Sequence, residues 1–247
     1  MDVWVGPNGV RPRGERRSPL PMANAMRGRE VMMASHEALG GNLGQVAETA
    51  WGGGVAPFAT GSKKLGMWLF ILSDAITFSA LLMAYSYVRV ASNNWPTPFE
   101  FYPGIVKATL MTVILLTSSV TMVMAVRAAK LGKRASVVRW LTATMAGGLA
   151  FVIIHATEWA GLIREGVRLF KNPWGAPLFG AAFFTLTGLH MTHVFCGVCY
   201  LGVVAALTAK GKLTSEDVEV SGLYWHFVDL VWMFIFPLVY ILSVKMG

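Results

Sequence analysis

The chain has 247 residues, of which 55% are hydrophobic and only 14% are charged. Soluble domains carry roughly 25% charged residues, so this composition excludes an ordinary water-soluble domain and a disordered chain. The net charge of +8 suits either nucleic acid or an anionic membrane surface, and the positions of the charges decide between them. Cys196 and Cys199 lie in one apolar segment and cannot form a secreted disulfide framework, so we interpret them as packing thiols in a helix.

Residues 1–62 differ in composition from the rest of the chain. They are rich in Gly, Ala, Pro and Arg, and their apolar runs are short. The basic start is not followed by a hydrophobic stretch, which argues against a secretory signal peptide. We interpret this segment as an extended or disordered N-terminal arm, in which the scattered apolar side chains of residues 30–51 could dock on a partner.

From residue 63 onward the chain consists of long apolar stretches that are almost free of charge. A helix needs about 20 such residues to cross a bilayer core of about 30 Å, and open strands cannot satisfy their backbone groups there. The stretches predict spans at residues 66–89, 104–128, 138–163, 178–208 and 221–244. We therefore predict an all-α integral membrane bundle of five transmembrane helices over residues 63–247. Gly147, Gly148 and the glycines of residues 180–202 indicate close helix packing.

The basic residues predict the orientation of this bundle. With a cytoplasmic N-terminus, 15 of the 21 Lys and Arg residues fall on the inner side. The positive-inside rule then favours a cytoplasmic N-terminus and a C-terminus outside, and it accounts for the net charge without nucleic acid. Trp95, Trp159 and Trp174 fall where an outer aromatic belt would lie.

A few ionisable side chains lie inside the predicted spans. A charge at the centre of a membrane helix costs about 2.5–3.5 kcal/mol on insertion scales, so each of them calls for a reason. They are Asp74, Glu158, Asp229, His155, His190, His193 and His226.

Six of these residues form pairs that are three positions apart in the sequence. Residues at i and i+3 share one face of a helix, so we expect each pair to point into the bundle and to hydrogen-bond within itself. The pairs are His155 with Glu158, His190 with His193, and His226 with Asp229.

Metal or haem ligation is one function that these residues suggest. His190 and His193 could supply two ligands to a metal, with Glu158 or Asp229 as a third. They are too close along one helix to clamp both faces of a haem, and the sequence lacks the ExxH motif that completes a di-iron site.

Three further interpretations remain open. Asp74 lies about 12 Å into its helix by helical rise, among apolar neighbours, where it is expected to stay protonated and could serve a proton or ion path. Glu158, His226 and Arg139 could bind lipid headgroups near helix ends. Alternatively, the polar groups form interhelical hydrogen bonds that fix packing and contribute about 0.6 kcal/mol each.

Four blocks of sequence together resemble subunit III of the haem–copper respiratory oxidases, the family of cytochrome c oxidase and bo-type quinol oxidase subunit III. The resemblance covers residues 63–246. The blocks are GMWLFILSD at 66–74, HATEW at 155–159, TGLHMTHV at 187–194 and YWHFVDLVWMFIFPLVY at 224–240.

This resemblance implies an accessory, non-catalytic subunit of a proton-pumping terminal oxidase that reduces oxygen to water in the bacterial inner membrane. Such a chain holds no cofactor itself, whereas its partner subunits carry haem and copper. It would pack directly on subunit I in a complex that also contains subunit II, retain structural phospholipids and support proton uptake. A larger respiratory supercomplex is a further possible partner.

The resemblance also assigns individual residues. Asp74 stands at the family's intramembrane carboxyl, which is usually Glu in mitochondrial-type oxidases, and Glu219 falls where the family often has a carboxylate. The Asp at position 74 and the five-helix length look more like the bo-type quinol oxidases, and SEDVEV at 215–220 replaces a His-rich loop of the mitochondrial form. The other positions that match the family are Glu158, His190, His193, Trp225, His226 and Asp229.

Two alternatives belong to other functional classes. One is a stand-alone haem- or metal-binding membrane redox protein, and the other is a proton-coupled transporter. A related possibility inside the family is a subunit of a nitric-oxide-reductase-type complex, whose partner would reduce nitric oxide instead of oxygen.

Overall fold

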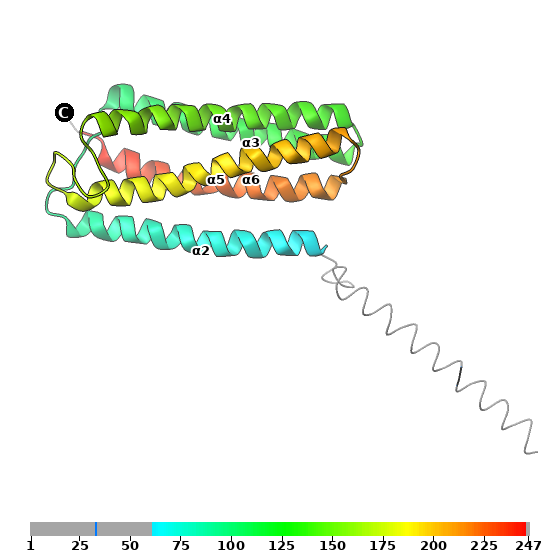
Figure 1. Ribbon diagram of the computed structural model, residues 1–247, viewed down its shortest axis with the longest axis horizontal. Helices are drawn as coiled ribbons and strands as arrows, with labels where there is room; N and C mark the ends of the chain where they lie inside the picture. Colours follow the sequence, from blue (N-terminus) through cyan, green and yellow to red (C-terminus); the bar gives the residue numbers. More distant parts are fainter. Residues whose placement is uncertain (1–32, 34–60, 246–247) are drawn as a thin grey trace, which may run out of the picture. The chain divides into compact units, whose positions relative to one another are not determined.

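The computed structural model describes Met33 and residues 61–245. The N-terminal arm predicted over residues 1–62, including its 30–51 segment, lies outside this range apart from Met33, Gly61 and Ser62. In the described part, five helices are long and apolar enough to cross a membrane, which confirms the predicted all-α architecture (Figure 1).

The five helices run alternately up and down the bundle. They are α2 (Ser62–Ala91), α3 (Val106–Lys130), α4 (Arg134–Arg164), α5 (Pro177–Ala209) and α6 (Ser215–Ile235), the last extended by the π-helical turn Phe236–Tyr240 and the 3-10 turn Ile241–Ser243. We call the end with the connections 131–133 and 210–214 the short-turn end. The opposite end, with segments 92–105 and 165–176, is the long-loop end.

Helices α5 and α6 form the centre of the bundle. Helix α6 packs against α2, α3 and α5, whereas α5 packs against α2, α4 and α6. The antiparallel pair α3 and α4 closes one side, and α2 lies on the other (Figure 1). Helix α2 therefore shows most of its surface to the surroundings, and α6 is the most buried of the five.

Helix α6 begins six residues before the predicted span. Thr214 forms a capping box with Asp217, in which each side chain binds the backbone N–H of the other residue. This cap satisfies N–H groups that the first turn leaves free, so residues 215–220 are helical and the expectation of a loop there is wrong. At the other end Pro237 lacks an N–H, and the hydrogen-bond pattern widens into the π-helical turn.

Side-chain hydrogen bonds fix α6 against α3. The indole Nε1 of Trp232 donates to Thr112 Oγ1 at 2.9 Å, and that of Trp225 donates to Ser118 Oγ at 3.1 Å. Both tryptophans are fully buried. Because an unpaired donor in this apolar interior would cost several kcal/mol, these bonds determine how α6 is rotated about its axis.

Two glycines of α4 allow the close helix packing that the sequence indicates. A Cβ at Gly148 would lie 2.5 Å from the Trp225 ring and 2.7 Å from Val198, and a Cβ at Gly147 would lie 2.9 Å from the Ser118 side chain. Small residues let the backbones approach in this way in membrane bundles.

The substitution Gly148→Ala is expected to destabilise the bundle by about 1–3 kcal/mol, because the added methyl group must displace the Trp225 ring. Thermal unfolding of the purified chain in detergent, followed by circular dichroism, measures this change. The matched control is Gly161→Ala on the same helix, where an added Cβ meets nothing within 4 Å of the described atoms. Equal stability of the two variants would contradict the packing described above.

Candidate functional site

Asp74 of α2 and His193 of α5 face one another across the contact between their helices. Asp74 Oδ2 lies 3.1 Å from His193 Nε2, and each side chain is 18% exposed. This distance is that of an ion pair, although Oδ2 is outside hydrogen-bond geometry with any described residue. The sequence pattern suggested a solitary Asp74, so its partner His193 is a result of the fold.

The other ring nitrogen of His193 determines where the protons of this pair reside. Nδ1 lies 2.8 Å from the carbonyl oxygen of Leu189, and because a carbonyl only accepts, Nδ1 must carry a proton. An attractive contact between Nε2 and Asp74 then requires one more proton. Either an imidazolium faces a carboxylate, or a neutral imidazole faces a carboxylic acid. The pair is neutral overall in both arrangements.

Aromatic residues hold the His193 ring in place. The Phe78 ring meets it edge-on at 5.2 Å, and the Tyr224 hydroxyl donates to the His193 carbonyl at 3.0 Å. These contacts come from α2 and α6, so three helices meet at His193.

His190 lies in the core of the bundle, where Phe78 of α2 also meets its ring at a centroid distance of 6.4 Å. The His190 ring stacks on Trp232, with the ring centroids 5.2 Å apart, and lies edge-to-face with Phe151 at 5.6 Å. Phe151 in turn stacks on the ring of His155 at 5.5 Å. Both imidazoles have no exposed surface, and none of their four ring nitrogens has a hydrogen-bond partner among the described residues. The neighbouring aromatic rings leave no space for a porphyrin against either histidine.

His190 and His193, which are three positions apart on α5, therefore have different neighbours. Within residues 61–245 the structure brings together no group of three His, Cys, Asp or Glu side chains that could hold a metal ion. The predicted use of His190 and His193 as two ligands of one metal, with Glu158 or Asp229 as the third, is not supported by this arrangement.

Glu158 is bound by a residue that the sequence analysis did not single out. The Tyr240 hydroxyl donates to Glu158 Oε2 at 2.7 Å, whereas His155 Nδ1 lies 3.7 Å from the same oxygen. The carboxyl thus joins α4 to the π-helical turn at the long-loop end. It also borders a polar pocket of about 430 Å³ that Lys107 and Glu165 help to line.

His226 and Asp229 do not pair with each other as expected. His226 Nδ1 lies 2.6 Å from the Ser119 hydroxyl on α3, and both oxygens of the buried Asp229 are without a hydrogen-bond partner in the described part of the chain. Trp225, on the same helix, also turns toward α3. The short hydroxyl side chains of α3 gave no pattern in the sequence, so these partners were missed.

Glu219 connects three helices at the short-turn end. Its carboxylate lies 3.1 Å from Lys64 Nζ on α2 and 3.7 Å from Lys130 Nζ on α3. It also lines a groove of about 360 Å³ between α3 and α6, together with Arg127 and His226. Of the predicted residues, the fold thus brings His226 and Glu219 to one groove and leaves Asp74 with His193 at another place.

Comparison with known proteins gives these features a context. The sequence model described as cytochrome c oxidase subunit III matches residues 43–244. The chain is 33% identical over 182 residues to quinol oxidase subunit 3 of Bacillus spizizenii, which covers 72% of this chain and 86% of the relative. It is 31% identical over 186 residues to cytochrome c oxidase subunit 3 of Alkalihalophilus pseudofirmus, covering 74% and 88%.

A third relative is the cytochrome bo(3) ubiquinol oxidase subunit 3 of Pseudomonas aeruginosa, which is 29% identical over 186 residues, covering 74% of this chain and 86% of the relative. The five apolar helices and these bacterial relatives support a multi-pass protein of the bacterial plasma membrane. The family match extends over most of the chain and includes the whole bundle, so this protein belongs to the cytochrome c oxidase subunit III family.

Proposed function

We propose that this chain is the accessory, non-catalytic subunit of a proton-pumping terminal oxidase that reduces oxygen to water. It packs against subunit I, in a complex with subunit II, and those partners carry the haem and copper. Its contribution is to stabilise subunit I, to retain phospholipids and to support proton uptake. The positive-inside distribution of Lys and Arg supports a cytoplasmic N-terminus and a C-terminus outside.

The observation that carries this proposal is the Asp74–His193 pair. Asp74 lies about 18 Å along α2 by helical rise, near the middle of the helix. Oδ2 and Nε2 are 3.1 Å apart, and the net charge of the pair is zero whichever of the two groups carries the extra proton. The pair therefore retains a proton within the apolar part of the subunit at little electrostatic cost, and its partial exposure leaves it accessible from the side of the bundle.

The surroundings of the buried histidines support a non-catalytic role. His155 and His190 are covered by Phe151 and Trp232, so a substrate cannot reach their ring nitrogens without opening the core. Catalysis of oxygen reduction is accordingly assigned to the partner subunits, and this chain acts on them through packing and proton supply.

Asp74→Asn is expected to leave assembly and the initial rate of oxygen consumption close to those of the unchanged complex. Its activity should decline several-fold faster during sustained turnover, because an amide cannot take up and release a proton as a carboxyl does. Oxygen uptake by the purified complex, followed over many turnovers, measures both quantities. Asp74→Glu is the matched control and should keep the slower decline. If Asp74→Asn matches the unchanged complex in initial rate and in inactivation, Asp74 has a packing role only.

The chain separated from its partners is expected to show no Soret absorption band, because the cores around His155 and His190 have no space for a haem. An optical spectrum of the purified chain, in oxidised and dithionite-reduced states, measures this. The intact complex provides the positive control, and the copurifying catalytic subunit reveals whether oxygen or nitric oxide is reduced. A Soret band in the isolated chain that disappears on His190→Ala would establish the haem-protein alternative instead.

A further inference from the structure

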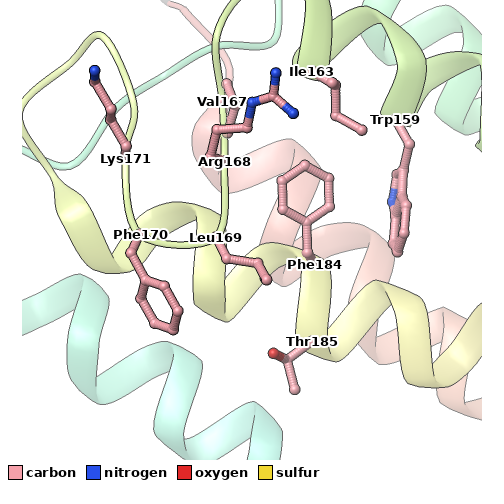
Figure 2. A pocket seen from close by; sticks show the side chains of 9 residues that line it. All are labelled: Trp159, Ile163, Val167, Arg168, Leu169, Phe170, Lys171, Phe184 and Thr185. Carbon is pink, nitrogen blue, oxygen red and sulfur yellow. The ribbon is translucent and has the colours of Figure 1, made fainter.

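A large apolar pocket opens at the long-loop end of the bundle, away from the Asp74–His193 pair. Its volume is about 640 Å³. The end of α4, the loop 165–176 and the first turns of α5 surround it, as Figure 2 shows. The family assignment and the polar residues discussed above leave this pocket without a role.

The walls of the pocket are almost entirely hydrocarbon. Trp159 and Ile163 of α4 form one side, and Phe184 of α5 lies opposite, with its ring edge-on to Trp159 at 4.9 Å. The indole nitrogen of Trp159 already donates to Thr187, so the ring shows the pocket only its apolar surface. Thr185 of α5 also lines the pocket, next to Phe184.

The loop that forms the third wall is held in a fixed conformation. Arg168 N donates to the Lys171 carbonyl at 2.6 Å, and Val167 N donates to the Leu162 carbonyl at 3.0 Å. The Arg168 carbonyl lies directly against Gly180 of α5, where a Cβ would come within 2.0 Å of it. The pocket therefore has firm walls and does not depend on a loose segment of chain.

The only charged residues among those that line the pocket in the described structure are cations, Arg168 and Lys171. Neither has an ion-pair partner within residues 61–245. In Figure 2 the Arg168 guanidinium extends toward Ile163 at one border of the pocket, and Lys171 points outward from the loop. An apolar trough bordered by cations at a helix end complements a molecule with hydrocarbon below and negative charge at the surface.

We propose that this pocket binds one anionic phospholipid, with its phosphate at Arg168 and one acyl chain along the trough between Trp159, Phe184 and Thr185. A free phosphate would leave the apolar trough uncovered, and a neutral hydrocarbon would leave the two cations without a counterion. Arg168 suits a phosphate because its planar guanidinium can donate two parallel hydrogen bonds. This inference rests on the proposed function, since it names one lipid that the subunit would retain and the residues that retain it.

The test uses the intact oxidase complex that contains this chain, reconstituted in nanodiscs made of equal parts of phosphatidylglycerol and phosphatidylcholine. Native mass spectrometry after detergent extraction counts the phospholipids that remain bound. The unchanged complex is expected to retain phosphatidylglycerol in preference to phosphatidylcholine. Arg168→Gln should weaken this retention about tenfold, the effect expected when one charge-assisted hydrogen bond is lost.

Two further variants separate the parts of the site. Thr185→Phe fills the trough and should abolish retention while leaving both cations in place. Arg164→Gln removes a neighbouring cation that does not line the pocket, and it should retain phosphatidylglycerol as the unchanged complex does. The Arg168 side chain lies on a surface loop, so its variant remains informative even if Thr185→Phe fails to assemble.

Three results would overturn the proposal. One is equal retention of phosphatidylglycerol by the unchanged complex and by Arg168→Gln, and another is equal retention of the two lipids. The third is a quinone or a partner polypeptide found in the trough in place of a lipid. Because lipid retention is counted independently of oxygen uptake, the Asp74→Asn experiment and this one can fail separately.

Discussion

A buried N–H or O–H group of a membrane bundle is stabilised by an acceptor inside the protein, because the surrounding hydrocarbon offers none. In this chain the need for internal hydrogen-bond partners is greatest in α6, because α6 is the most buried of the five helices. Its two large indoles reach Thr112 and Ser118 on α3, and Trp232 is thereby held in the middle of the bundle. The position of that ring determines much of what lies around it, since His190, Phe151 and His155 all pack against it.

The same rotation of α6 separates the two histidines of α5. Residues three positions apart on an α-helix differ by about 60° in direction, so one helix can show them to different neighbours. Trp232 of α6 stacks on His190, whereas Asp74 of α2 faces His193, and Phe78 of α2 lies beside both rings. A motif that looks like a pair of metal ligands in the sequence thus becomes one core residue and one partner of Asp74.

The number of helices could be predicted from the sequence because the length of an uncharged stretch is a direct physical requirement of the bilayer. The start of α6 could not, because the stretch of charge at 215–220 obscured a capping box that depends on Thr214 and Asp217. Gly147 and Gly148 correctly indicated close helix packing, because side chains of neighbouring helices occupy the space that a Cβ would take.

The candidate residues were identified from the sequence more reliably than their partners. An ionisable group in a span is conspicuous, so Asp74 and Glu158 could be selected without a structure, whereas Glu219 precedes the predicted span and was indicated only by the family resemblance. Their partners depend on which helices are neighbours, which helical periodicity does not reveal. Glu158 pairs with Tyr240, which is 82 positions away in the chain, and His226 pairs with Ser119 at a separation of 107. Pairing within a helix was the available hypothesis, and for His226 with Asp229 it was wrong.

The described cations differ in the partners that they find, and this difference bears on the phospholipid pocket. At the short-turn end, Lys63 meets Asp217 at 2.6 Å and Glu219 lies close to both Lys64 and Lys130, so these three cations have acidic partners among the described residues.

At the long-loop end, Arg89 donates to the Ser243 hydroxyl and to the Leu242 carbonyl, which are neutral acceptors, and Arg168 and Lys171 border an apolar trough. Arg168 and Lys171 thus stand beside hydrocarbon without an ion-pair partner among the described residues, and a molecule bound at this pocket could supply their counterion. An anionic phospholipid combines that negative charge with acyl chains that can fill the apolar trough.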